Sequence, residues 1–469
     1  MIEQHLRNIL IFITSMLIIY SLLSFTLLVS IVVSIILASA ITLIFYKLLN
    51  TKQEVIKKEP QILDFSEANS AFASIFGSEQ CINFKLPNTS ILTNNVISFT
   101  KESSIKTLAD NIIEFYKKRD LIIEYRGFDS AIKLDTIKFA DIKTTSGKQI
   151  KFTDITKYDT DLARMLMFDP SDIKFLSVIP GEQSFGITIP NNRDNNVRIK
   201  NIFDDSIFQQ YLKKHQKLIE DECYLNCVPI VLGADSKGFV YFDMTNDPHA
   251  LIAGASGSGK SVCINTILTS LLMLHTPESL HLYLADLKGG IELYDYRHLP
   301  HTKVFADDIT STNDMLVSIH TIMQERFKKI RPYKSIVEYN QAIRKKENFI
   351  PFMVVVVDEF ISLASNKDIM ESLIQISAMA RAAGIFLILS TQKPTKNVVD
   401  TRIKANLTAR ICFRTADDTE SRVVIDTSDA AELMGGGDGI VKTSKSTLRF
   451  QGCFVDRSET TKILEHWKN

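Results

Sequence analysis

The sequence lacks any surplus of charge of one sign. Its 469 residues hold 54 Lys and Arg against 54 Asp and Glu, so the formal net charge at pH 7 is zero. Net charge therefore gives no sign of a polyanionic partner, and a nucleic-acid site would need a local basic patch. A chain of this length with 45% apolar residues can bury the cores of two or three domains, which excludes a disordered or fibrous protein.

Cysteine is also scarce and scattered. Only Cys223 and Cys227 lie close together, and no second pair or histidine cluster completes a zinc site. This spacing favours reduced structural thiols in a cytosolic domain over a metal site. The cysteines are Cys81, Cys223, Cys227, Cys263, Cys412 and Cys453.

Charged residues are absent from one long stretch near the N-terminus, residues 9–46. One membrane-spanning helix needs about 20 apolar residues, so we expect a hairpin of two short spans, at about 9–23 and 25–46. A cleaved signal peptide is the rival interpretation, but its apolar core would be shorter and end at small residues. Arg7 precedes the stretch and Lys47 with three further lysines follow it, which predicts a multi-pass membrane protein with both ends in the cytoplasm.

The rest of the chain divides by pattern. Short alternating runs such as Leu121–Tyr125 and Phe185–Ile189 favour a small α+β domain, whereas apolar strands alternating with amphipathic helices predict a doubly wound α/β sheet after Val228. The polar run Tyr211–Glu222 is expected to be a helical hinge. The predicted organisation is a membrane anchor at 1–47, a linker at 48–60, an α+β assembly or partner domain at 61–215, a motor domain at 216–460 and a tail at 461–469.

In the motor domain, we expect strands at Ala250–Ala253, Leu280–Ala285, Phe352–Val357, Ile385–Ser390 and Ala409–Phe413. Helices should begin near Lys260, Thr312, Asp368 and Val398.

The strongest local signal is a P-loop, G-x-x-x-x-G-K-S, placed between an apolar strand and a helix. Its glycines let backbone N–H groups turn toward phosphates, and the helix N-terminus adds a favourable dipole. Lys260 should reach the β- and γ-phosphates of ATP and Ser261 should hold Mg²⁺, which predicts a P-loop NTPase of RecA-like fold. The predicted nucleotide-binding residues are Gly254, Ala255, Ser256, Gly257, Ser258, Gly259, Lys260 and Ser261.

A second acidic site follows the apolar strand Met353–Val357. A strand so continuously apolar is buried on both faces, and we expect it beside the P-loop strand. There Asp358 would support Mg²⁺ and Glu359 could polarise the attacking water. Gln392, at the end of another predicted strand, lies where an amide could sense the γ-phosphate; a plain polar strand end is the alternative.

Several motifs resemble the motor of the FtsK/SpoIIIE family of DNA translocases, in the same order. They are Pro248-His249, Arg381-Ala-Ala-Gly384-Ile, Thr391-Gln392-Lys393-Pro394, Ile403-Lys404-Ala405-Asn406, Ser421-Arg422, Gly435-Gly-Gly-Asp438-Gly and Gln451-Gly452-Cys-Phe454-Val455. The resemblance covers about half the chain. It implies an ATPase that assembles as a ring hexamer, with ATP between subunits and DNA in the centre.

A ring motor also needs a residue in trans to stabilise charge on the transferred phosphoryl group, and arginine suits this role. Arg326 is the first candidate, with Arg381, Arg410 and Arg414 open. For DNA, the basic strip of Lys393, Lys396, Arg402 and Lys404 falls where the resemblance implies pore-facing loops, and it would contact phosphates without reading sequence. A merely solvated charged loop is the alternative.

The segment Asp286-Leu287-Lys288 lacks the proline usual in chromosome-segregation members and looks more like the conjugative-element branch, that of coupling proteins. We also expect no winged-helix module after the motor. The first hypothesis is therefore a DNA-pumping ATPase in the bacterial cell membrane, used in conjugative transfer and meeting a relaxase or transfer channel. A protein-export motor of a specialised secretion system is the alternative, disfavoured because such motors carry several P-loop domains. A non-catalytic scaffold is disfavoured by the complete set of site residues.

Overall fold

A computed structural model describes residues 86–95, 102–130, 132–149, 151–179, 182–191, 196–220, 222–395 and 399–468. All of them belong to one of the two units into which the chain divides, Phe65–Asn469. The predicted spans 9–23 and 25–46 and the linker 48–60 lie outside the described residues. Within the described ranges, no helix combines the length and the apolar character needed to cross a membrane.

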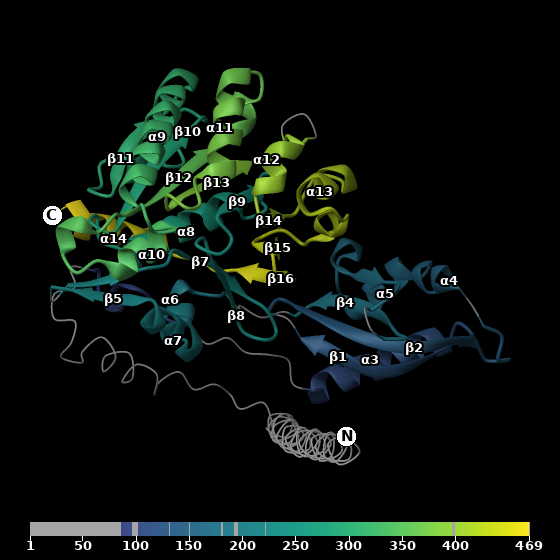
Figure 1. Cartoon of the computed structure of the whole chain (residues 1–469). Coiled ribbons are helices and arrows are strands. Elements are labelled where there is room, and N and C mark those ends of the chain that lie inside the picture. Colours follow the sequence, from purple (N-terminus) through teal and green to yellow (C-terminus); the bar gives the residue numbers. More distant parts are fainter. Residues whose placement is uncertain are drawn as a thin grey trace, which may run out of the picture. The chain divides into compact units, whose positions relative to one another are not determined.

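The described part of the motor domain is built on a ten-stranded sheet with the order β11-β10-β12-β13-β9-β14-β15-β16-β7-β8 (Figure 1). Six strands, from β11 to β14, run parallel, and the pairs from β14–β15 onward are antiparallel. The strands are β7 (Pro229–Ala234), β8 (Phe239–Asp243), β9 (His249–Ala253), β10 (Leu280–Asp286), β11 (Thr302–Ala306), β12 (Phe352–Asp358), β13 (Ile385–Thr391), β14 (Ala409–Phe413), β15 (Asp438–Lys442) and β16 (Thr447–Gly452).

Helices connect these strands and cover both faces of the sheet (Figure 1). The α-helices are α8 (Lys260–Leu274), α9 (Ile309–Lys329), α10 (Ile336–Ala342), α11 (Lys367–Met379), α12 (Thr401–Asn406), α13 (Asp418–Ile425) and α14 (Arg457–Lys468). Single 3-10 turns are η3 (Tyr294–Tyr296), η4 (Lys346–Asn348), η5 (Phe360–Leu363) and η6 (Asp429–Glu432).

The central strands are buried on both faces because helices pack on each side. Along β12, Val354 and Val356 point into a core shared with α8, while Val355 and Val357 point into a second core shared with α9 and α11. Alternate side chains of a strand point to opposite faces, so a continuously apolar strand is what such a three-layer arrangement requires. The all-valine run is therefore explained by its place in the middle of the sheet.

The expected strand order is wrong in one respect. We expected β12, which ends in Asp358, to lie beside the P-loop strand β9, but β13 lies between them and pairs in parallel with both. Both β12 and β13 are fully buried and begin with a continuous apolar run, so composition did not show which of them lies beside β9. The carboxyl end of β13, rather than that of β12, is thus the immediate neighbour of the P-loop strand.

The other predicted strands of the parallel half are present, with bounds within one residue of those expected. The predicted helices near Lys260, Thr312 and Asp368 are α8, α9 and α11. The helix expected near Val398 begins at Thr401, and Val398 itself lies outside the described residues. The antiparallel strands β7, β8, β15 and β16 were not assigned from sequence.

The small α+β domain has a four-stranded antiparallel sheet, β1-β2-β4-β3. Its core joins strand residues such as Ile137 and Ile187 to Ile112 and Leu162 from the helices. The two predicted alternating runs fall in β1 and β4. Its elements are α3 (Glu102–Lys117), β1 (Leu121–Ser130), β2 (Leu134–Thr144), α4 (Phe152–Thr156), α5 (Asp159–Leu166), η2 (Pro170–Asp172), β3 (Lys174–Leu176) and β4 (Phe185–Pro190).

The connection into the motor differs from the expected hinge helix. The helix α7 (Ser206–Lys214) ends before the hairpin of β5 (Gln216–Ile219) and β6 (Glu222–Leu225), so only residues 211–214 of the segment 211–222 are helical. It was misassigned because a short polar run is compatible with an exposed hairpin as well as with a helix. The preceding helix α6 (Ile199–Phe203) and α7 contribute Ile202 and Phe208 to the core of the motor domain, as does η1 (Thr89–Ile91) through the adjacent Leu92.

The segment expected to be a tail is helical. Residues 461–468 continue α14, whose Trp467 donates an indole N–H to the carbonyl of Leu272 at 3.0 Å. The Trp467 ring also stacks edge-on against His301, with 4.5 Å between ring centroids. The last described turn of the chain is therefore packed against α8 and the motor core.

Candidate active site

The P-loop, residues 254–261, connects β9 to α8, and its glycines are required by close contacts. At Gly259 the backbone is left-handed, with φ +117°, and a Cβ atom there would lie 2.8 Å from the Cα of Gly437. At Gly254 a Cβ would lie 2.7 Å from the Cβ of Phe413. Only glycine meets both conditions, so the loop can fold tightly over the start of α8.

The triple-glycine segment 435–437 packs against the backbone of the P-loop. The N–H of Gly437 donates to the carbonyl of Ser258 at 2.9 Å, and the N–H of Gly452 donates to the carbonyl of Gly437 at 2.7 Å. The side-chain amide of Gln451 donates to the carbonyl of Gly436 at 3.0 Å. Two of the sequence motifs, Gly435–Gly439 and Gln451–Val455, therefore serve the shape of the phosphate loop.

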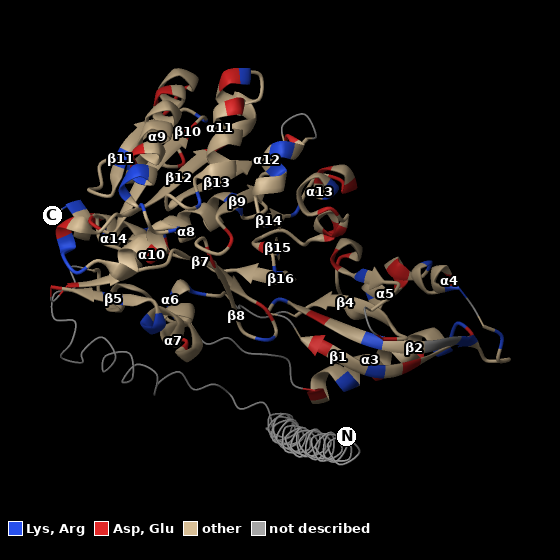
Figure 2. Ribbon diagram, in the orientation of Figure 1, with Lys and Arg blue, Asp and Glu red and all other residues tan. Residues whose placement is uncertain are grey.

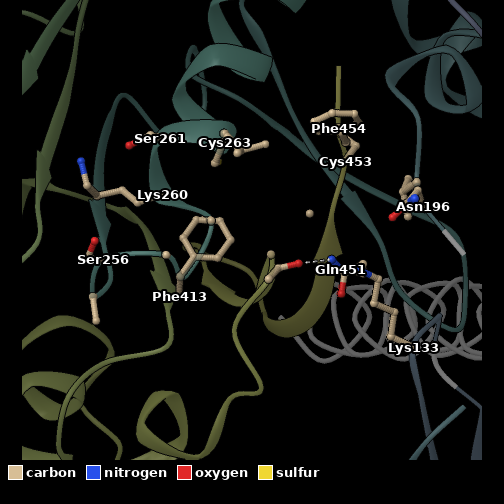
Figure 3. A pocket seen from close by; sticks show the side chains of 18 of the residues that line it. Lys133, Asn196, Ser256, Lys260, Ser261, Cys263, Phe413, Gln451, Cys453 and Phe454 are labelled. Atoms are coloured by element: carbon tan, nitrogen blue, oxygen red, sulfur yellow. Dashed lines mark hydrogen bonds between the residues drawn. The ribbon is translucent and has the colours of Figure 1, made fainter. Parts of the chain in front are cut away.

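A cavity of about 470 Å³ opens in front of the P-loop (Figure 3). Figure 3 shows Lys260, Ser261 and Cys263 coming from the loop and α8, with Phe413 beside them and Gln451, Cys453 and Phe454 along another wall. Its size lies within the range of small-molecule sites, and the N-terminus of a helix is a natural place for phosphate. The cavity therefore suits a nucleotide with its phosphates on the P-loop.

Lys260 and Asp358 form a buried ion pair. The Nζ of Lys260 lies 2.6 Å from Oδ1 of Asp358, and their side chains are 3% and 1% exposed. Ser390 donates a further hydrogen bond to the same oxygen. Burial alone would raise the pKa of Asp358, but the Lys260 charge and these hydrogen bonds outweigh it and lower that pKa below its ordinary value. The carboxylate is therefore ionised at neutral pH.

Glu359 stands next in the chain in an unusual backbone conformation, with φ 55° and ψ 49°. This left-handed geometry strains a glutamate, and such residues cluster at functional sites. One carboxylate oxygen accepts from the Thr391 hydroxyl and from the N–H of Gln392, each at 3.1 Å. The other lies 3.3 Å from the Nζ of Lys288. Glu359 thus bridges the ends of β13 and β10.

Ser261 and Asp358 together fit a divalent cation of the Mg²⁺ type. Among the described residues, Oδ2 of Asp358 is a buried oxygen without a hydrogen-bond partner, and Ser261 lines the cavity in front of the P-loop. Mg²⁺ is bound by few protein oxygens together with phosphates and waters, and this pair supplies such oxygens. The Ser261 hydroxyl donates to Oε1 of Glu292 at 3.1 Å, which leaves its lone pairs available.

Five of the predicted site residues are therefore brought to one place: Lys260, Ser261, Asp358, Glu359 and Gln392. Gln392 lines the cavity, and its backbone N–H donates a hydrogen bond to Glu359.

Arg326 is not brought to this place. It is 7% exposed, and its two terminal nitrogens donate to the carbonyls of Ala383 and Pro351, each at 2.8 Å. These carbonyls lie just before the N-terminal ends of β13 and β12, whereas Asp358 lies at the C-terminal end of β12. Burial lowers the pKa of Arg326 to about 10. Arg326 therefore acts as a structural residue, because a guanidinium with both ends bound inside its own chain cannot reach a neighbour's phosphate.

The other arginine candidates differ in availability. Arg410 is tied to Asp426 by an ion pair of 2.7 Å. Arg381 is exposed and donates to the carbonyl of Thr245. Arg414 is exposed beside the P-loop, where its carbonyl accepts from the N–H of Ala255 at 2.8 Å.

The predicted DNA strip is less uniform than its sequence suggests. Lys396 lies outside the described residues, and Lys393 is exposed at the end of β13. Arg402, on the basic helix α12 (Figure 2), forms ion pairs with Glu371 and Asp400 at 3.0 and 3.1 Å. Lys404 pairs with Asp426 at 2.8 Å. Two of the four cations, Arg402 and Lys404, are therefore paired with acidic side chains. The sequence prediction of a basic strip did not take these acids into account.

Sequence reasoning missed three residues of the site. Asp286 ends β10 beside Asp358 and is fully buried, with its carboxylate accepting from the N–H groups of Lys288 and Leu293. Lys288 and Glu292 then contact Glu359 and Ser261. A signal was available, since Asp286 follows a predicted apolar strand just as Asp358 does.

Comparison with known proteins agrees with this geometry. Residues 226–396 match the profile of the FtsK/SpoIIIE family. The DNA translocase FtsK of Chlamydia pneumoniae is 33% identical over 336 residues, which are 67% of this chain and 40% of that protein. The DNA translocase SpoIIIE of Bacillus subtilis is 31% identical over 334 residues, 68% of this chain and 40% of that protein. This chain thus spans less than half the length of these relatives.

Among solved structures, the monomer form of the pCW3 conjugation coupling protein TcpA with ATPγS has the same fold, with a TM-score of 0.53 and 23% identity. The match covers 76% of this chain and 97% of that one. With the family profile, the homologous translocases and the P-loop geometry in agreement, the motor of this chain is an ATPase domain of the FtsK/SpoIIIE family.

Proposed function

We propose that this protein is a membrane-anchored ATPase that uses ATP hydrolysis to move DNA. The observation that carries the proposal is that Lys260 and Ser261 line a nucleotide-sized cavity within an FtsK/SpoIIIE domain, with Asp358 paired to Lys260 and Glu359 next to Asp358 in the chain. The relatives named above are DNA translocases, and DNA is the substrate we propose here.

In the proposed mechanism Lys260 changes partner. In this structure its charge is satisfied by Asp358; when ATP binds, the β- and γ-phosphates attract the ammonium because they carry more charge than one carboxylate. Asp358 and Ser261 would then hold Mg²⁺, which would supply neutralisation of charge on the phosphates. Glu359 orients the attacking water, and Gln392 senses the γ-phosphate from the end of β13.

We propose that DNA contacts run along Lys393, Lys396, Arg402 and Lys404. Exposed ion pairs such as Arg402–Glu371 are each worth about 0–1 kcal/mol and are weakened by salt, so a DNA phosphate can replace the acidic partner. Contacts of this kind position the duplex or strand without reading its sequence.

The proposal also covers the location, the assembly and the pathway of the motor. The charge-free stretch 9–46 would anchor the protein in the bacterial cell membrane with its motor in the cytoplasm. The motor would act as a homohexamer with ATP between subunits, completed by an exposed arginine such as Arg414 or Arg381 rather than by the buried Arg326. Conjugative transfer is the pathway we favour, on the basis of the proline-free Asp286-Leu287-Lys288 segment, and a relaxase or channel protein would be its partner.

The test is ATP hydrolysis by the full-length protein in detergent, with no DNA, with double-stranded DNA and with single-stranded DNA, at two salt concentrations. A DNA motor should be stimulated by at least one form of DNA, and less so at high salt because phosphate contacts release counterions. Turnover that is indifferent to both DNAs would overturn the proposal and favour a protein-export motor.

The DNA strip has its own test. Neutralising Lys393, Lys396, Arg402 and Lys404 to Ala should weaken DNA binding and reduce the slope of log K against log salt by about one for each phosphate that is no longer bound. A matched control replaces the exposed Lys303, Lys328, Lys329 and Lys345, on the β11 side of the domain, so that the net charge changes equally. Equal slopes in the two variants would move the DNA site elsewhere.

A further inference from the structure

The loop after β10, residues 287–293, contacts both halves of the active site. Near its start, Lys288 reaches Glu359, with 3.3 Å between Nζ and Oε2. Near its end, Glu292 accepts the Ser261 hydroxyl at 3.1 Å. The cation-binding serine and the water-activating glutamate are thus held by side chains only four positions apart.

This loop is fixed at both ends by one buried carboxylate. Oδ1 of Asp286 accepts from the N–H of Lys288 at 3.1 Å, and Oδ2 accepts from the N–H of Leu293 at 2.9 Å. Asp286 itself is the register partner of Asp358 on the adjoining strand. These two hydrogen bonds hold the ends of the loop close together, with Lys288 and Glu292 on the same short segment.

The two carboxylate oxygens of Glu359 have different neighbours. One oxygen accepts from Thr391 and Gln392, and the other faces Lys288. Its side chain is only 13% exposed. To activate a water, a carboxylate must offer an oxygen within hydrogen-bond reach of that water. Oε2 accepts no hydrogen bond from any described residue, so it is the oxygen that a water would approach, and the Lys288 ammonium 3.3 Å away competes with that water.

Lys288 is the contact that a nucleotide can remove. The hydrogen bonds from Thr391 and Gln392 come from the end of a fully buried strand, whereas Lys288 is a flexible side chain on a loop. Phosphate carries more negative charge than a carboxylate and competes for the ammonium.

We propose that Lys288 is a positioning residue that holds Glu359 in a resting orientation, and that the 287–293 loop makes the release of Glu359 depend on what Ser261 binds. The site then does not hydrolyse ATP until a bound nucleotide displaces the contacts at both ends of the loop, those of Lys288 and Glu292. This inference rests on the ATPase activity within the proposed function, but it does not depend on DNA.

The first experiment measures kcat and KM for ATP without DNA in the full-length protein. Replacing Lys288→Ala should raise kcat about two- to fivefold, the factor expected when a partly exposed ion pair is removed. The affinity for ATPγS, measured separately by equilibrium binding, should stay within about twofold. Lys288→Arg keeps the cation and should return kcat toward the wild-type value, and Lys303→Ala, an exposed lysine on β11, is the matched control.

An unchanged or lower kcat in Lys288→Ala would overturn the proposal, as would a large fall in ATPγS affinity, which would make Lys288 a phosphate ligand instead. A wild-type protein that hydrolyses ATP without responding to DNA would contradict the proposed DNA substrate. The effect of Lys288→Ala on kcat could still be measured in that protein, because the assay contains no DNA.

The second experiment follows the loop itself by hydrogen–deuterium exchange. In the wild-type protein, ATPγS with Mg²⁺ should change deuterium uptake in the peptide covering residues 287–293. In Glu292→Gln, whose neutral side chain holds Ser261 less strongly, that change should be smaller. A wild-type loop whose exchange is the same with and without ATPγS would refute the coupling.

Discussion

The ammonium of Lys260 lies 2.6 Å from the carboxylate of Asp358, in a place where both side chains are almost completely withdrawn from water. The residue that should bind phosphate and the residue that should support the cation are therefore each other's partner in this structure. A buried charge without a partner is costly, so this pairing stabilises the site.

Lys260→Ala should abolish ATP turnover and also lower the free energy of unfolding by about 3–5 kcal/mol, because Asp358 becomes a buried unpaired carboxylate. ATP hydrolysis and urea unfolding measure the two effects. The double variant Lys260→Ala/Asp358→Asn removes both charges and should recover much of the stability while remaining inactive. Normal turnover in the single variant would overturn the P-loop assignment, and an equally unstable double variant would contradict the role of the ion pair.

Glu359→Gln should bind ATP nearly as well as the wild-type protein and hydrolyse it at least about 100-fold more slowly, since the amide cannot take a proton from water. Its hydrogen bonds from Thr391 and Gln392 can persist, because the amide keeps one oxygen acceptor. Equilibrium binding of ATP and single-turnover hydrolysis separate these effects. A hydrolysis rate equal to that of the wild type would remove Glu359 from the mechanism.

Arg326 and Arg414 should respond differently to alanine. Arg326→Ala leaves two buried carbonyls without donors and should lower the free energy of unfolding by about 2–4 kcal/mol. Arg414→Ala, at an exposed position beside the P-loop, should leave stability within about 0.5 kcal/mol and reduce ATP turnover. For both variants, urea unfolding measures the change in stability and an ATP hydrolysis assay measures the change in turnover. A stable but inactive Arg326→Ala would restore Arg326 as the candidate for charge stabilisation.

Acidification should destabilise the motor domain through three buried histidines. Burial lowers the pKa of His249 and His275 to about 3 and that of His301 to about 4, so all three stay neutral in the folded protein at neutral pH. The unfolded chain takes up their protons as the pH falls below about 6.5. Stability is therefore complete above that pH and declines toward pH 4, by about 1–2 kcal/mol for each histidine between pH 7 and pH 5.

Trp467 provides the measurement, because it is the one tryptophan of the sequence and packs against His301. Urea unfolding followed by its fluorescence at pH 7 and pH 5 gives the difference in free energy. In His301→Gln the same difference should shrink by about 1–2 kcal/mol, because one titrating group is gone. An identical pH dependence in the variant and the wild type would exclude His301 as a cause.

Much of the active site followed from local sequence. A glycine-rich turn between an apolar strand and a helix predicts a phosphate loop, since the needed conformations are properties of those few residues. The same holds for Asp358 and Glu359, which end a strand whose continuous apolar character requires burial on both faces. Family motifs supplied the rest, although the purpose of Gly435–Gly437 as a support for Ser258 and Gly259 emerged only from their contacts.

Other features depend on which segments meet across the fold. The position of β13 between β12 and β9 could not be read from two strands that both begin with a continuous apolar run, and the strip cations Arg402 and Lys404 could not be paired with Glu371 and Asp426.

The sequence by itself therefore indicated an ATPase and predicted its main reacting groups, because these reside in short segments with their own conformational requirements. The tertiary structure alone decided their partners. Lys260 pairs with Asp358, 98 positions away in the chain, and Lys288 pairs with Glu359. Arg326 is buried and donates hydrogen bonds to two backbone carbonyls. Such pairings are set by the packing of strands into one sheet, where the register between neighbours brings distant side chains to the same edge.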